Sequence, residues 1–181
     1  FEELKTNFYR ELLGSQWRPA LEQEYGKQLF AIAELSLRTF QPEIIEKLQE
    51  ENRLASAYNK LKATAKIHFD GETYNLSSIQ PREEDPDRTK RAAASKAKWD
   101  WMASQQTEME RIFDELVKVR HQIALELGFE NFIELGYARM LRTDYNATDV
   151  ANYREQIRLH IVPLAHKLYQ WQADRLGIKE L

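Results

Sequence analysis

The sequence has 181 residues and a mass of 21.4 kDa, enough for one domain with a sizeable core or for part of a larger one. Its 26 basic and 29 acidic residues give a formal net charge of -3, so no global field favours nucleic acid or an anionic membrane. There is no cysteine, which excludes disulfides and fits a reducing compartment such as the cytoplasm. No apolar run approaches the roughly 20 residues that span a bilayer, so we expect no membrane partner.

The two ends of the chain predict a fragment. It starts at Phe1 without an initiator methionine and stops at Leu181 without a charged or disordered tail. Apolar residues recur three and four positions apart over most of the length, and Gly and Pro number only 6 and 5. This period predicts a mainly α-helical protein.

Three helices are predicted in the first third of the chain. The first covers about residues 2–13 and stops at Gly14. The second starts near Pro19, because proline suits the first turn of a helix, and runs toward Phe40. Pro42 opens the third, and its run EKLQEEN is interpreted as a solvated face.

A β-hairpin follows, because AKIHFDGETYNL alternates between apolar and polar residues. The pair Asp70-Gly71 is typical of a two-residue type I′ turn. The predicted facing pairs are Phe69 with Glu72, Ile67 with Tyr74 and Ala65 with Leu76. A lone two-stranded ribbon is marginal in water, so the apolar side must rest on helices or on another strand.

The run QPREEDPD, residues 80–87, is predicted to be an exposed connector between residues 1–79, the N-terminal helices and hairpin, and residues 88–181, a region of long helices. All three are expected to belong to one larger body. Asp87 is a predicted N-cap for helical spacing that continues from residue 88 to Gly128.

Residues 88–181, the region of long helices, contain two predicted irregularities. Thr107 and Glu110 have the spacing of a capping box, which favours a break there. The last long helix starts at Asn146 or Thr148, and Pro163 inside it is expected to produce a kink by removing a backbone bond to Leu159.

Residues 131–142 read as a helix that is apolar over most of its circumference, which is typical of a helix buried inside something large. Gly136 in its middle predicts a close approach by another backbone. Arg139, Arg142 and Asp144 have two open interpretations: a buried ion-pair cluster that fixes the following turn, or the lining of a polar channel.

Motifs with catalytic chemistry are missing. None of the four histidines (His68, His121, His160 and His166) is followed by Glu, and none lies four positions from another, as a zinc-binding HExxH helix requires. There is no cysteine nucleophile and no GxSxG. The run RTKRAAASKAKWDW mixes basic and tryptophan residues, but its Ala and Trp positions form a packed helix side. We therefore assign no catalytic, cofactor-binding or metal-binding residue and expect no nucleic-acid partner.

Several blocks of the chain together resemble one family. EENRLASAYNKLKATAKIHFDGETYNLSSI, DRTKRAAASKAKW, LVKVRHQIALELGFENFIELGYARMLRTDY, YREQIRLHIVPLAHKL and QADRLGI are similar, in this order, to oligoendopeptidase F and other thimet-type zinc metallopeptidases. The likeness covers nearly the whole chain. In that family these blocks lie upstream of the HExxH helix, in a large helical body whose two lobes enclose a channel.

This resemblance implies that the parent protein is a zinc metalloendopeptidase that hydrolyses oligopeptides, with zinc held by a later part of the chain. It implies that residues 1–181 alone are inactive and bind no zinc, and that their partner is the rest of the same chain. A competing hypothesis is a non-enzymatic helical module that binds another protein. An HExxH in the parent reading frame distinguishes the two.

Overall fold

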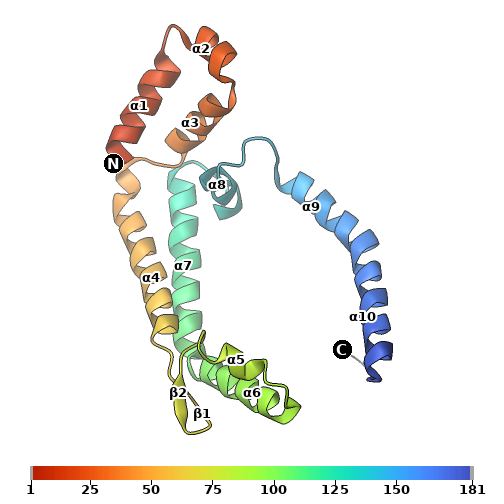
Figure 1. The fold of residues 1–181 in the computed structure, drawn as a ribbon. Helices are drawn as coiled ribbons and strands as arrows, with labels where there is room; N and C mark the ends of the chain where they lie inside the picture. The colour runs from red at the N-terminus through yellow and green to blue at the C-terminus, as the bar shows by residue number, and fades with distance from the viewer. Residues whose placement is uncertain (1, 180–181) are drawn as a thin grey trace. The chain divides into compact units, whose positions relative to one another are not determined.

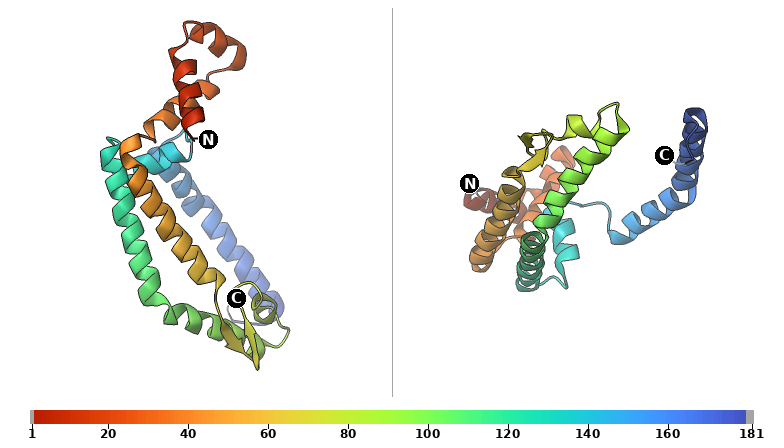
Figure 2. Two further views of the ribbon diagram at one scale, coloured as in Figure 1. Left: turned by 90° about the vertical axis from the view of Figure 1, so that its left-hand side faces the viewer. Right: turned by 90° about the horizontal axis from the view of Figure 1, so that it is seen from below.

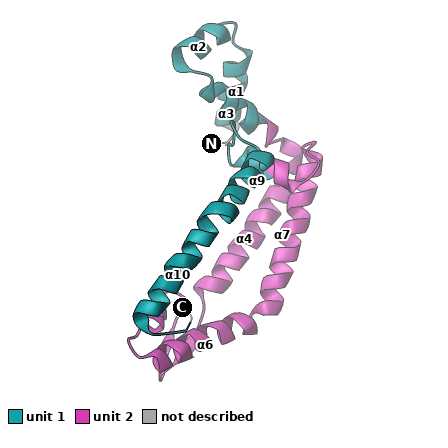
Figure 3. Ribbon diagram, turned by 90° about the vertical axis from the view of Figure 1, so that its right-hand side faces the viewer, with its two compact units in different colours: residues 1–37, 136–181 teal, residues 38–135 magenta. Residues whose placement is uncertain are grey.

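The computed structural model describes residues 2–179, and their backbone is mainly α-helical with one small antiparallel sheet. The predicted fold class is therefore confirmed. The chain divides into two compact units (Figure 3): residues 38–135 form unit 2, whereas residues 1–37 and 136–181 form unit 1. Each unit is described separately below.

Unit 2 is built around two long helices. After the short 3₁₀ turn η1 (Pro42–Ile44), α4 (Ile45–Ala63) packs side by side and antiparallel with α7 (Gln106–Glu126), as Figures 1 and 2 show. Side chains buried in this unit include Leu54 on α4 and Ile112, Val119 and Ile123 on α7. On α7 these residues lie seven and four positions apart, close to two turns and one turn, so they share one apolar side that faces α4.

Polar contacts also join these two helices. Arg120 Nε on α7 donates to Glu51 Oε1 on α4 at 2.7 Å, and the Glu51 side chain is only 12% exposed. At the last residue of α7, Glu126 Oε1 lies 2.7 Å from Lys47 Nζ on α4 in a more exposed pair. The guanidinium of Arg120 also stacks over the Phe132 ring, 5.4 Å from its centroid.

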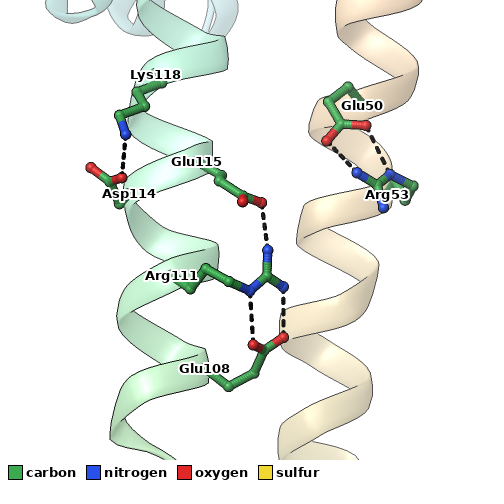
Figure 4. A network of polar contacts seen from close by, with 7 residues as sticks. All are labelled: Glu50, Arg53, Glu108, Arg111, Asp114, Glu115 and Lys118. Carbon is green, nitrogen blue, oxygen red and sulfur yellow. Dashed lines mark hydrogen bonds and ion pairs between the residues drawn. The ribbon is translucent and has the colours of Figure 1, made fainter.

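Several surface ion pairs lie on the same two helices (Figure 4). Arg111 donates to Glu108 at 2.8 and 2.6 Å and to Glu115 at 2.7 Å, all within α7. These hydrogen bonds favour the ionised partners, so the pKa of Glu108 lies below its usual value and that of Arg111 above it. Because the groups are exposed and local in sequence, they make solvated helix faces rather than a core.

The hairpin has the predicted register. Strand β1 (Ile67–Phe69) pairs antiparallel with β2 (Glu72–Tyr74), with Ile67 opposite Tyr74 and Phe69 opposite Glu72. Asp70 and Gly71 both have positive φ, 50° and 77°, as a type I′ turn requires. These two facing pairs and the turn are therefore confirmed.

The apolar side of the hairpin rests on a helix, as expected for so short a ribbon. Helix α6 (Arg88–Ser104) supplies Ala94, which is buried together with Ile67 and Ile79 in one cluster. Partly buried residues packed against this cluster are Phe69, Tyr74, Leu76, Ala97 and Trp101. The helix thus provides the neighbour that the hairpin lacks within its own two strands.

Gly71→Val is expected to loosen the hairpin. A Cβ on Gly71 would meet no atom within 4 Å, so the cost comes from the backbone: a β-branched residue resists φ of 77°. Hydrogen exchange of the amides in residues 67–74 should accelerate about tenfold, which corresponds to a local cost of ~1.4 kcal/mol. Gly71→Asn, which tolerates positive φ, is the control and should exchange nearly as slowly as the unchanged protein.

The segment between the hairpin and α6 contains one helical turn, α5 (Gln80–Glu83), and Lys98 on α6 pairs with Glu83 at 2.8 Å. Asp87 caps α6 as predicted, because its Oδ1 accepts from Thr89 N at 2.8 Å. Helix α6 ends at Ser104 and α7 starts at Gln106. The break expected near Thr107 is therefore confirmed, and it lies at Gln105, two residues before Thr107. No side chain caps α7 at Gln105, however.

Unit 1 begins with α1 (Glu2–Gly14), α2 (Arg18–Tyr25) and α3 (Gln28–Arg38). The single helix predicted from Pro19 to Phe40 is wrong, because Gly26 adopts φ of 82° and divides it into α2 and α3. Arg18 links the two pieces by donating to Glu22 and Glu34, each at 2.7 Å.

The helix predicted for residues 131–142 is shorter: α8 spans Phe132–Arg139. Leu135 and Ala138 are buried, whereas Ile133 and Met140 are 65% and 56% exposed. Gly136 is half-buried, and the close backbone approach inferred there stays a prediction.

The last predicted helix is a series of three elements. Helix α9 (Ala147–Gln156) begins at Asn146 with a capping box, then passes into a π-helical turn, η2 (Ile157–Ile161), and into α10 (Val162–Leu176). Instead of breaking the helix at Pro163, the chain widens just before it, so that the amide of Val162 reaches the carbonyl of Ile157. Across the described part of the chain, every helix is too short or too polar to traverse a bilayer.

Candidate functional site

The four histidines do not form a site. His68 lies on β1 with its Nδ1 3.0 Å from Thr73 Oγ1, His121 lies on α7, His160 in η2 and His166 on α10, and all four are exposed. Among the described side chains, those of residues 4–179, no three His, Asp or Glu residues come together as a metal-binding group. A candidate site must therefore be sought among other side chains.

The segment that joins α8 to α9 in unit 1 is an irregular backbone held by several hydrogen bonds. Helix α8 ends in a Schellman motif, in which Arg142 N donates to Tyr137 O at 3.1 Å and Leu141 N to Ala138 O at 3.0 Å. The left-handed position, usually glycine, is taken by Leu141 with φ of 54°. That conformation costs a non-glycine residue about 1 kcal/mol, and because no glycine stands here, the amino-acid pattern contains no stop signal for the helix.

The following residues are fixed on the other side. Asn146 Oδ1 accepts from Thr148 N and Asp149 N, and Asp149 Oδ2 accepts from Asn146 N at 2.9 Å, which closes a reciprocal capping box on α9. Between the two motifs, Thr143 Oγ1 lies 3.0 Å from Gln28 Nε2 at the start of α3. Residues 140–146 are thus held by hydrogen bonds at both ends and in the middle.

Arg142 is positioned by this frame. Its guanidinium carbon lies 4.4 Å from the centroid of the Tyr137 ring and 5.3 Å from that of Tyr145, and the two rings meet edge to face with centroids 6.4 Å apart. The side chain is half-buried. Two tyrosine faces therefore hold one guanidinium, an arrangement favoured by the ring quadrupole.

Arg142 also lines a cavity of about 400 Å³. Its lining comes from the α8–α9 segment and the first two turns of α9: Arg142, Tyr145, Asp149, Val150 and Tyr153. The cavity is as large as the smaller pockets that bind organic ligands, and it combines aromatic walls with one cation. Such a lining can recognise a small anionic group attached to an apolar or aromatic one.

Of the three residues predicted to form an ion-pair cluster or to line a channel, the structure brings only Arg142 into this cavity. Asp144 is exposed and forms no ion pair with Arg142, while Arg139 is the last residue of α8. The ion-pair interpretation is therefore wrong for Arg142 and Asp144. That Tyr145 and Tyr153 lie together is not predicted from the sequence. The signal available for it was their position: they follow Arg142 by three and eleven residues and lie on either side of the predicted N-cap, Asn146.

One family model and three solved structures match this chain, and all of them carry the names of peptidases. The Peptidase M3 N-terminal domain family matches residues 1–40. A crystal structure of a protein provisionally named oligoendopeptidase F, from crystals grown by microfluidic seeding, is 51% identical with a TM-score of 0.93 and covers 99% of this chain. The corresponding values are 49%, 0.91 and 99% for a protein of the same provisional name from Bacillus anthracis str. Ames.

A third structure, PZ peptidase A with an inhibitor, is 49% identical over 98% of this chain with a TM-score of 0.91. The chain spans about a third of each of these structures: 32%, 33% and 32% of their lengths. A search of the curated proteins found no match. The resemblance to oligoendopeptidase F that the sequence blocks indicated is thereby confirmed.

Proposed function

We propose that this chain, which belongs with the oligoendopeptidase F proteins, is a non-catalytic segment of a zinc-dependent peptidase that hydrolyses short peptides. The observation that carries the proposal is the identity of 49–51% over 98–99% of the chain to solved structures three times as long. Half of all residues shared over a full segment is far more specific than a common helical fold. The match to the Peptidase M3 N-terminal domain supports the same class.

Zinc in this proposal is bound outside the segment. A catalytic zinc needs about three protein ligands that converge on one point. The described residues supply no such group, and their four histidines lie apart on exposed surfaces. The residues present therefore do not fit a zinc site, and no step of the hydrolysis is assigned to them.

The segment's own role is to form part of the peptide-binding body. Helix α10 carries Leu164, Leu168 and Trp171 at helical spacing, and these side chains are 52%, 54% and 63% exposed. An apolar stripe of this kind normally lies against another part of a protein. The length difference from the solved structures supplies the occupant: the remainder of the same peptidase chain.

The test uses the longest reading frame that contains this segment. The purified protein is incubated with a library of internally quenched peptides of 5–12 residues, with and without a chelator, and its metal content is measured. We expect chelator-sensitive cleavage and about one zinc per chain, whereas residues 1–181 alone should retain neither. A full-length protein without cleavage that instead captures a protein partner would favour the alternative, a helical interaction module.

A further inference from the structure

We infer that Arg142 and its cavity form a binding site for a carboxylate of a peptide ligand. The inference rests on the proposed function for its ligand class, a short peptide, but its geometry comes from unit 1 alone. Three features of the site support it: the way the guanidinium is held, the hydrogen bonds it has left to make, and the shape and charge of the cavity beside it.

The guanidinium is held before any ligand arrives. The backbone amide of Arg142 donates to the carbonyl of Tyr137 at 3.1 Å, and its side chain stacks on the ring of that same residue at 4.4 Å. Tyr145 contacts the guanidinium from a second direction, at 5.3 Å. An arginine fixed in this way loses little conformational freedom when it binds, so more of the interaction energy remains as affinity.

The hydrogen-bonding edges of the guanidinium are available. Stacking occupies the faces of the planar group, whereas its five N–H donors lie in the plane and point outward. Among the side chains that the structure describes, those of residues 4–179, Arg142 makes no hydrogen bond and no ion pair, in contrast to Arg18, Arg111 and Arg120, which all hold carboxylates at 2.6–2.8 Å. The ligand that matches a planar, forked donor is a carboxylate.

The cavity fits the end of a peptide better than an inorganic anion. Its volume of about 400 Å³ leaves room beside the guanidinium for one or two residues, and Tyr145, Tyr153 and Val150 offer apolar walls for their side chains. The one acidic residue in the lining, Asp149, is engaged: its Oδ2 accepts from Asn146 N at the first turn of α9, where the helix dipole favours its charge. The Asp149 carboxylate is thus already used in the capping box of α9.

The experiment measures which peptides lose affinity when Arg142 is changed. The full-length protein and its Arg142→Gln and Arg142→Lys variants are given three forms of one quenched peptide: the free acid, the C-terminal amide, and the amide with one internal Glu. Arg175→Gln is the matched control, because Arg175 also stacks on an aromatic ring, Trp171 at 5.6 Å, but does not line the cavity. Both kinetics and binding by titration calorimetry are recorded.

We expect Arg142→Gln to raise KM and Kd for the free acid about tenfold, the loss of one charge-assisted pair, and to change kcat and the amide little. Arg142→Lys should recover part of the difference, and Arg175→Gln should have no effect. If the internal Glu restores binding of the amide in the unchanged protein, the site also accepts a side-chain carboxylate; if it does not, the site is specific for the C-terminus.

Equal effects on acid and amide would overturn the inference. So would a lowered thermal midpoint of the Arg142→Gln variant without any change in discrimination, because Arg142 would then pair with a carboxylate of the protein itself. Titration calorimetry measures binding without cleavage, so it tests the carboxylate site independently of the proposed peptidase activity. A protein that binds the acid more tightly than the amide but cleaves neither would refute the peptidase and keep the carboxylate site.

Discussion

Leu168→Asp is expected to lower the stability of the full-length protein by about 3–5 kcal/mol, the usual cost of a buried charge without a partner. Leu168 lies on α10 between Leu164 and Trp171, and all three are more than half exposed in the present structure. We have proposed that the remainder of the peptidase covers this stripe. A carboxylate there would have to be desolvated or would keep the two parts from packing.

The measurement is the thermal midpoint of the full-length variant, together with its rate of peptide cleavage. His166→Asp is the control: it introduces the same charge two positions earlier, about 200° around the helix and therefore on the opposite side, where His166 is exposed. It should leave both quantities nearly unchanged. An equally small effect of Leu168→Asp would mean that the stripe faces solvent in the full-length protein.

Arg120→Ala should destabilise the α4–α7 pair by about 1–3 kcal/mol, because it leaves the carboxylate of Glu51 without its 2.7 Å donor. The Glu51 side chain is only 12% exposed, so water can replace that donor only in part. The substitution also removes the stacking of Arg120 on Phe132. Combining it with Glu51→Gln tests the first cause, since the double variant should lose less than the sum of the two single ones.

The more exposed pair on the same two helices provides the control. Lys47 and Glu126 are also 2.7 Å apart, but their side chains are 32% and 41% exposed. Lys47→Ala should therefore cost less than about 1 kcal/mol in urea unfolding. If both lysine and arginine variants lose the same small amount, burial of Glu51 does not set the strength of its ion pair.

Local patterns in the sequence predicted the features that depend on only a few neighbouring residues. The hairpin is an example: alternation and the Asp70-Gly71 turn specify its register without reference to the rest of the chain. The N-caps Asp87 and Asn146 are further examples, because a capping side chain reaches only two or three residues along the backbone. Such interactions are set by covalent proximity.

Features without a local marker were missed. The end of α8 uses Leu141 where a Schellman motif usually has glycine, and so the helix was predicted to run three residues too far. At Pro163 the removal of one backbone bond was foreseen, but not the π-turn that compensates for it. In both cases neighbouring structure stabilises a conformation that the residue itself disfavours.

By itself the sequence determined the helical class, the hairpin and its register, the main helix caps, and the similarity to oligoendopeptidase F. Only the tertiary structure decided which side chains meet. It joined Glu51 to Arg120 across 69 positions of the chain, and it held Arg142 between Tyr137 and Tyr145 beside a cavity rather than pairing it with Asp144. The physical reason is that periodicity specifies the side of a helix on which a residue lies, whereas the partner depends on how helices and turns pack in three dimensions.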